Sequence, residues 1–138
     1  MKKFRFSLQR LLDIREAKET EVKHELMKVL SMQNLERVLQ DEMRAKISRY
    51  EVQYSERLKK GVFSADEVMS LMRYSDVSRN AIVESNRRIE ELQPEVDRIR
   101  EKLVAASRDK KVVEKLKDRK FEEYEYEFDS SCSPIIFF

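Results

Sequence analysis

The sequence contains one glycine and two prolines in 138 residues, so residues that favour tight turns are almost absent. A β-sheet or a bundle of many helices needs several turns, and this chain has few residues to make them. Charged residues make up 41% of the chain and the mean hydropathy is −0.70, which leaves little apolar material for a layered globular core. Long, uninterrupted helices are the fold that remains.

Other absences indicate in which cellular compartment the protein is expected. The single cysteine, Cys132, cannot form an internal disulfide, as is typical of a reducing environment. The sequence has no run of about 18 apolar residues that could cross a membrane. Charged residues also follow Met1–Phe6, where a signal peptide would have its apolar core. The sequence therefore predicts a cytoplasmic protein.

Residues suited to catalysis are also scarce. The only histidine, His24, stands among charged residues and is expected on the surface. The chain has no glycine-rich phosphate loop, metal-ligand cluster or nucleophile elbow, so we expect no enzyme, catalytic residue, cofactor or metal. Its 29 basic and 27 acidic residues are interleaved, which argues against nucleic-acid binding.

Hydrophobic residues in the first half recur in steps of three and four, as on one face of a helix. The helix is expected to begin at Ser7 as N-cap, with Phe6 and Leu11 as a hydrophobic staple. Arg15 and Glu19 interrupt the stripe, so pairing there is expected to be looser. The main part of the predicted stripe is Val22, Leu26, Val29, Met32, Leu35, Leu39, Met43, Ile47, Tyr50, Tyr54 and Leu58.

A turn is predicted near residues 60–64. Lys59 and Lys60 precede Gly61, the usual end of a helix, and Ser64 and Glu67 then form a capping box with Phe63 and Val68 at the staple positions. A helix end and a helix start this close together predict a hairpin of two antiparallel helices.

The second half carries a heptad pattern that predicts a helix to about Phe128. Pro94 falls inside it and predicts a kink. Polar residues at seam positions, Arg79, Asn86 and Lys110, either specify the register or mark points where a partner enters. The two core positions of the heptad hold Ile82, Ile89, Val96 and Leu103, and Ser85, Leu92, Ile99, Ala106 and Val113.

The predicted fold is therefore all-α, a long two-helix antiparallel coiled-coil hairpin. Residues 1–6 form an N-terminal lead, residues 7–128 the hairpin, and residues 129–138 a disordered tail that ends in the apolar Ile135–Phe138. Near the turn, Tyr50, Tyr54 and Tyr74 are either anchors for a partner or half-exposed core residues.

Two segments carry a family resemblance. Residues 4–16 read FRFSLQRLLDIRE, the pattern F-x-F-x-L-x-x-L-L-x-x-R-E, and Glu114-Lys115-Leu116-Lys117 is followed by Phe121 and Tyr124. These segments resemble the two ends of the bacterial flagellar export protein family FliJ. The resemblance extends to about Asp129.

This resemblance implies a cytoplasmic stalk of the flagellar type III export apparatus, monomeric when isolated and held peripherally at the inner membrane. Such a stalk binds and promotes the hexameric export ATPase and contacts the export gate's cytoplasmic domain and export chaperones. The ATPase contact would fall on Phe4, Phe6, Leu8, Leu11, Leu12, Arg15, Glu114, Leu116 and Lys117, at the end opposite the turn. The gate contact would fall on Ile47, Tyr50, Tyr54, Tyr74 and Ala81.

Two other functions are compatible with the same residues. One is a self-associating coiled-coil scaffold or adaptor, in which the seam of each hairpin pairs with a second copy. The other is a substrate-holding export chaperone that uses exposed hydrophobic residues and the apolar tail.

Overall fold

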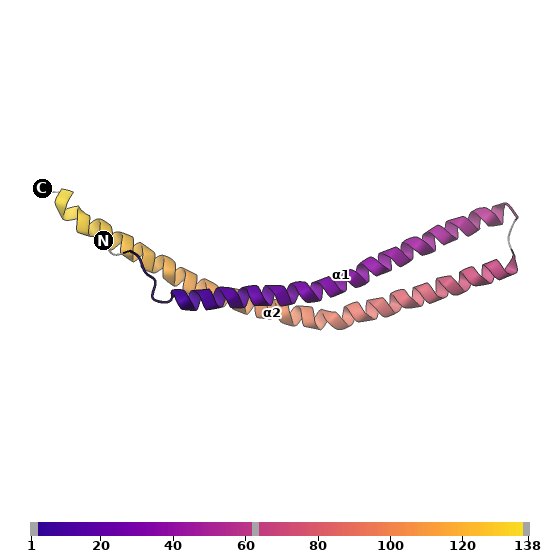
Figure 1. The fold of residues 1–138 in the computed structure, drawn as a ribbon, viewed down its shortest axis with the longest axis horizontal. Helices are drawn as coiled ribbons and strands as arrows, with labels where there is room; N and C mark the ends of the chain where they lie inside the picture. The colour runs from indigo at the N-terminus through magenta and orange to yellow at the C-terminus, as the bar shows by residue number, and fades with distance from the viewer. Residues whose placement is uncertain (1–2, 62–63, 137–138) are drawn as a thin grey trace. The chain divides into compact units, whose positions relative to one another are not determined.

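The computed structural model describes residues 3–61 and 64–136 and contains two long helices. Helix α1 spans Gln9–Lys59 and helix α2 spans Ala65–Ile136. The two helices pack against each other as a hairpin (Figure 1), so the predicted all-α hairpin is confirmed.

Contacts divide the chain into two compact units. The terminal unit comprises Met1–Leu26 and Arg98–Phe138, and the turn unit comprises Met27–Asp97. Each unit therefore contains one stretch of α1 and one stretch of α2.

The side chains between the helices follow a strict alternation of three and four residues in both helices. This spacing averages 3.5 residues, as in a coiled coil, and keeps one face of each helix toward the other. In α2 the two predicted core positions are confirmed, since all nine of their residues are buried or half-buried. In α1 the corresponding buried or half-buried residues are Leu12, Arg15, Glu19, Val22, Leu26, Val29, Gln33, Glu36, Gln40, Met43 and Ile47.

The predicted stripe of α1 is wrong in its middle and toward its end, where Tyr50 and Leu58 are 42% and 60% exposed. Met32, Leu35 and Leu39 are 48%, 61% and 40% exposed. Their immediate neighbours face α2 instead: Gln33 and Gln40 are buried, and Glu36 is half-buried. The prediction followed apolar residues at an average step of 3.6, whereas the heptad that begins at Leu12 continues through polar positions whose side chains form hydrogen bonds.

The start of α1 also differs from the prediction. The carbonyl of Leu8 accepts the first helical hydrogen bond, from the amide of Leu12 at 3.0 Å, so Leu8 and not Ser7 is the N-cap. The reason is a preceding turn, in which the amide of Gln9 donates to the carbonyl of Phe6 at 3.1 Å. The predicted hydrophobic staple between Phe6 and Leu11 required Ser7 as the N-cap, so these two residues no longer occupy the staple positions.

The turn confirms the predicted stop at Gly61 and the N-cap at Ser64. The Glu67 carboxylate does not complete the predicted capping box, because its Oε2 is buried without a hydrogen-bond partner. Gly61 has a φ of +73°, a left-handed conformation that glycine adopts without steric cost. Ser64 Oγ accepts a hydrogen bond from the amide of Glu67 at 3.2 Å, which caps α2. Glu67 Oε1 accepts a bond from Arg57 Nη2 at 3.2 Å and so links the two helices. The staple residue Phe63 lies outside the described residues.

Helix α2 continues past both prolines. At Pro94 the helix is unbroken, and packing of Leu92 and Val96 on either side offsets the lost backbone hydrogen bond. The kink itself stays a prediction. The helix also extends to Ile136, beyond the predicted end at Phe128, although three serines and Pro134 follow Asp129.

We expect Gly61→Ala to lower the free energy of unfolding by about 1 kcal/mol. An added Cβ at this position meets nothing within 4 Å, so the cost comes from the left-handed backbone alone. Thermal unfolding followed by circular dichroism measures it. Gly61→Asn is the control, because asparagine tolerates this conformation better than alanine. Equal melting temperatures for wild type and Gly61→Ala would contradict the prediction.

Candidate interaction surfaces

All nine residues of the predicted ATPase contact belong to the terminal unit, and we call them the terminal surface. The segment before α1 runs along α2 (Figure 1), where Phe4 packs against two aromatic rings. Its ring centroid lies 5.2 Å from that of Phe121, edge to face, and 5.6 Å from that of Tyr124. Such aromatic pairs contribute beyond the area they bury. They hold the N-terminal segment beside the C-terminal part of α2.

Some residues of the terminal surface hold the hairpin together. Leu12 is 3% exposed and belongs to the core. Arg15 Nη1 donates a hydrogen bond to the carbonyl of Asp109 on α2 at 2.7 Å. Leu8 remains 38% exposed. The remaining members are half-buried: Phe4, Phe6, Leu11, Glu114, Leu116 and Lys117. A partner therefore has access to Leu8 but not to Leu12.

An ion pair lies in the seam of the terminal unit, where looser pairing was expected. Glu19 is 6% exposed, and its Oε1 lies 3.0 Å from Lys110 Nζ and 3.0 Å from Lys23 Nζ. The hydrogen bond from Lys110, with those from Lys23 and Ser107, lowers the pKa of Glu19 from 4.5 to about 2. The same bond raises the pKa of Lys110. Pairing in this stretch is specific, and Lys110 occupies the predicted seam position.

The five residues of the predicted gate contact belong to the turn unit, and we call them the turn surface. Tyr50 and Tyr74 come from different helices, and their ring centroids lie 5.0 Å apart at 71°. They are 42% and 38% exposed and share a cleft with Lys46, Arg49 and Gln53. Tyr54, Ile47 and Ala81 are half-buried, and Ile47 lines a different cleft, with Arg79 and Val83 among its neighbours. The turn surface thus brings two of its tyrosines together, and Ile47 stands one helical turn before Tyr50 on α1.

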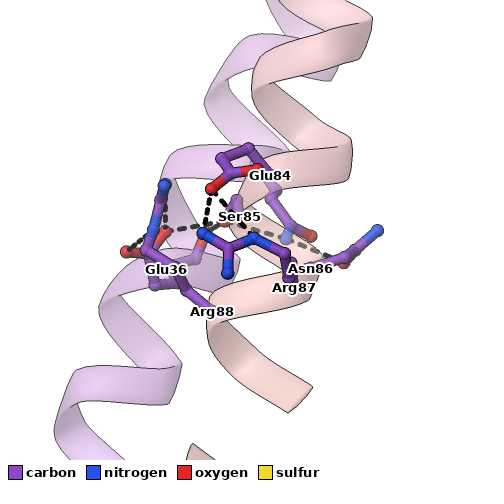
Figure 2. A network of polar contacts seen from close by, with 7 residues as sticks. Glu36, Glu84, Ser85, Asn86, Arg87 and Arg88 are labelled. Carbon is purple, nitrogen blue, oxygen red and sulfur yellow. Dashed lines mark hydrogen bonds and ion pairs between the residues drawn. The ribbon is translucent and has the colours of Figure 1, made fainter. Parts of the chain in front are cut away.

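A polar network crosses the seam of the turn unit (Figure 2). Glu36 accepts hydrogen bonds from Arg88 Nε at 2.9 Å and from Ser85 Oγ at 2.7 Å, and these bonds, that of Arg88 first, lower the pKa of Glu36. Gln40 Nε2 donates to Ser85 Oγ and to Asn86 Oδ1, both at 2.9 Å. On the outer side of α2, Arg87 pairs with Glu84 in the same view.

Sequence reasoning missed the buried glutamines. Gln33 is 1% exposed, and its Nε2 donates to the carbonyl of Ile89 at 3.1 Å and to Gln93 Oε1 at 3.2 Å. The strict heptad extended from Leu12 would have placed Gln33 and Gln40 in the seam. The predicted polar seam position at Arg79 is wrong, because this side chain is 67% exposed and pairs with Glu51 at 3.7 Å.

The sequence matches a family model. The model of the flagellar FliJ protein covers residues 4–130, which include both segments that carried the resemblance. The chain belongs to the FliJ family. FliJ proteins are non-catalytic, so this chain is a non-catalytic component of the flagellar export apparatus. Neither a comparison with curated proteins nor one with solved structures gave a significant match.

Two further observations concern metal sites and membrane-spanning helices in this FliJ protein. Over residues 3–61 and 64–136, no group of three or more histidine, cysteine, aspartate or glutamate residues is arranged to hold a metal ion. In the same ranges, no helix is long and apolar enough to span a membrane.

We expect ionised Glu19 to stabilise this FliJ protein at neutral pH and to lose that effect in acid. Because its pKa falls from 4.5 to about 2 on folding, the stabilisation is complete above about pH 5 and is lost as the pH falls through about 2. Glu19→Gln should cost roughly 2 kcal/mol at neutral pH and should reduce the loss of stability in acid.

Urea unfolding at neutral and acid pH measures both effects. Glu21→Gln, at an exposed position of the same helix, is the control and should keep the wild-type pH dependence. An unchanged pH dependence in Glu19→Gln would show that the ion pair does not contribute.

Proposed function

We propose that this FliJ protein is a stalk that binds the hexameric export ATPase, promotes its activity and contacts the cytoplasmic domain of the membrane export gate. The observation that carries the proposal is the family match over residues 4–130, which includes all residues of the terminal and turn surfaces. The protein would act in the cytoplasm, held at the inner membrane only through the apparatus.

The terminal surface supports an ATPase contact because it combines accessible and fixed parts. Leu8 offers an exposed apolar side chain, and Glu114 and Lys117 add charges of both signs from α2. Phe4 is fixed by its aromatic contacts, so the segment around it is already ordered before a partner binds. Preorganisation of this kind reduces the entropy lost on binding.

Promotion of the ATPase would follow from differential binding. A stalk that binds the assembled ring more tightly than the separate subunits shifts the equilibrium toward the ring. No catalytic group of the stalk is needed, because the ATP-binding sites belong to the ATPase. The ion pair of Glu19 and Lys110 would keep α1 and α2 in one register, and so keep both sides of the terminal surface together.

The tyrosine pair supports the gate contact. Tyr50 and Tyr74 bury one side of their rings against each other and leave the remainder accessible. Tyrosine is frequent at interface centres, because it contributes a large apolar area and a polar hydroxyl at a low entropy cost. Lys46 and Arg49 line the same cleft, which favours a partner surface with acidic groups.

Export chaperones are the third proposed class of partner. A groove on α2 in the terminal unit is lined by two valines that are 58% and 60% exposed, Val104 and Val112. Arg108, Lys111 and Lys115 line it as well. An amphipathic helix of a chaperone with acidic flanks would complement this groove.

We expect Leu8→Asp to weaken binding to the export ATPase at least tenfold, with loss of ATPase stimulation. The charge falls on an accessible part of the terminal surface, so the hairpin should stay folded. Leu12→Asp is unsuitable as a test, because Leu12 is buried in the seam. Titration of labelled protein with the ATPase, together with phosphate release, measures both effects.

The matched control is Ile14→Asp, which changes a 56% exposed residue of α1, six residues after Leu8 and outside the terminal surface. It should bind and stimulate as the wild type does. Normal binding by Leu8→Asp, with helicity retained in both variants, would exclude Leu8 from the contact.

We expect the double variant Tyr50→Ala with Tyr74→Ala to bind the gate's cytoplasmic domain at least tenfold more weakly while ATPase binding is kept. Calorimetry with the purified gate domain measures the affinity. Tyr126→Ala, which removes a 74% exposed tyrosine from the terminal unit, should leave it unchanged. Equal affinities of all three proteins would exclude the tyrosine pair from the gate contact.

A further inference from the structure

The outer face of α1 in the turn unit carries an exposed apolar stripe, formed by Met32, Leu35 and Leu39. These side chains are 48%, 61% and 40% exposed, and Val38 beside them is 43% exposed. The stripe has steps of three and four residues, the same spacing as the seam but displaced by one residue. A helix with this spacing can pair with a second helix through knobs-into-holes packing. We call these four residues the outer stripe.

Helix α2 does not supply that second helix. The face of α1 that meets α2 is occupied by Gln33, Glu36 and Gln40, whose hydrogen bonds to α2 fix the rotation of α1. Rotating α1 to bury the outer stripe would break these bonds and leave polar groups buried without partners. An occupant of the outer stripe must therefore come from another molecule.

The charges beside the outer stripe indicate what that molecule is. Lys28 and Glu42 each stand seven residues from Leu35, which is two turns of the same helix face on either side. Both are exposed, and within the described ranges neither forms an ion pair. One end of the face thus presents an unpaired cation, and the other end an unpaired anion.

This pattern is self-complementary when two copies of α1 run antiparallel. With Leu35 opposite Leu35 of the second copy, Lys28 lies opposite Glu42 of the second copy, and Met32 lies opposite Val38. The two-fold axis repeats both pairs, so each copy contributes the same surface, as an isologous dimer requires. A partner of a single charge sign would be repelled at one end of the face.

We propose that the outer stripe binds a second copy of this chain in a reversible antiparallel dimer centred on Leu35. Four apolar side chains per copy and two ion pairs in the whole dimer make a smaller surface than stable dimers use, so the association is weak and the protein is monomeric when dilute. The proposal is independent of the stalk function, because the outer stripe shares no residue with the terminal or turn surface. It also differs from a scaffold that pairs through the seam, since the seam stays closed.

Sedimentation velocity of the full chain, from low micromolar to near-millimolar concentration, tests the dimer. We expect the wild type to shift from monomer toward dimer, and Leu35→Asp to raise the dissociation constant at least tenfold. Val52→Asp is the matched control, because Val52 is 60% exposed on α1 in the same unit. A wild type that stays monomeric throughout, or a Leu35→Asp variant that associates like the wild type, overturns the proposal.

Charge reversal distinguishes the antiparallel pairing from general stickiness. Lys28→Glu and Glu42→Lys each place like charges opposite each other at both ends, so each should weaken association about fivefold or more. The double variant restores opposite charges and should recover the wild-type dissociation constant. Failure of this recovery overturns the proposed register.

Cross-linking tests the centre of the interface directly. In a Cys132→Ser background, Leu35→Cys should form an intermolecular disulfide at least tenfold faster than Val52→Cys, because the two introduced thiols lie opposite each other only at position 35. Equal cross-linking rates for the two variants overturn the proposal.

Discussion

The structure depends on hydrogen bonds between polar side chains that are enclosed by two helices. Gln33, Gln40 and Glu19 are all nearly excluded from solvent, and each has partners on α2. Apolar side chains tolerate a shifted or rotated neighbour with little loss, whereas a buried amide or carboxylate that loses its partner carries its full desolvation cost. The polar contacts therefore select one rotation and one register for a hairpin that apolar residues alone would leave less defined.

The two units differ in what fills their seams. Buried apolar residues concentrate in the terminal unit, as Leu12, Val22, Ile99, Ala106 and Val113, whereas the buried residues described in the turn unit are Val96 and four polar ones, Gln33, Gln40, Ser78 and Ser85. Apolar burial supplies most of the favourable free energy of packing, so the turn unit opens locally at a lower cost. A contact surface in the turn unit can therefore adapt to a partner, while the terminal surface rests on a firmer core.

Much of the fold could be predicted because its signals are local. A single glycine after two lysines and a serine three residues before Glu67 define the turn, and both act where predicted. The heptad of α2 was readable because eight of its nine predicted members are apolar, Ser85 being the exception. In α1 the middle of the seam was wrongly predicted, because Met32, Leu35 and Leu39 form the more hydrophobic face. The sequence pattern alone cannot show that Gln33 and Gln40 have hydrogen-bond partners on α2.

The candidate surfaces were harder to predict for a related reason. Family signatures place residues at a contact but do not separate those that touch a partner from those that support the fold, and Leu8 and Leu12 stand in the same motif with opposite exposure. The residues wrongly predicted for the core of α1, Met32, Leu35 and Leu39, show that an apolar helical pattern can also mark an exposed face. Once the polar heptad takes the seam, the more apolar face of α1 is left in water, and hydrophobic residues kept outside a core at regular helical spacing suggest a contact with another helix. An error in assigning the core thus points to a surface.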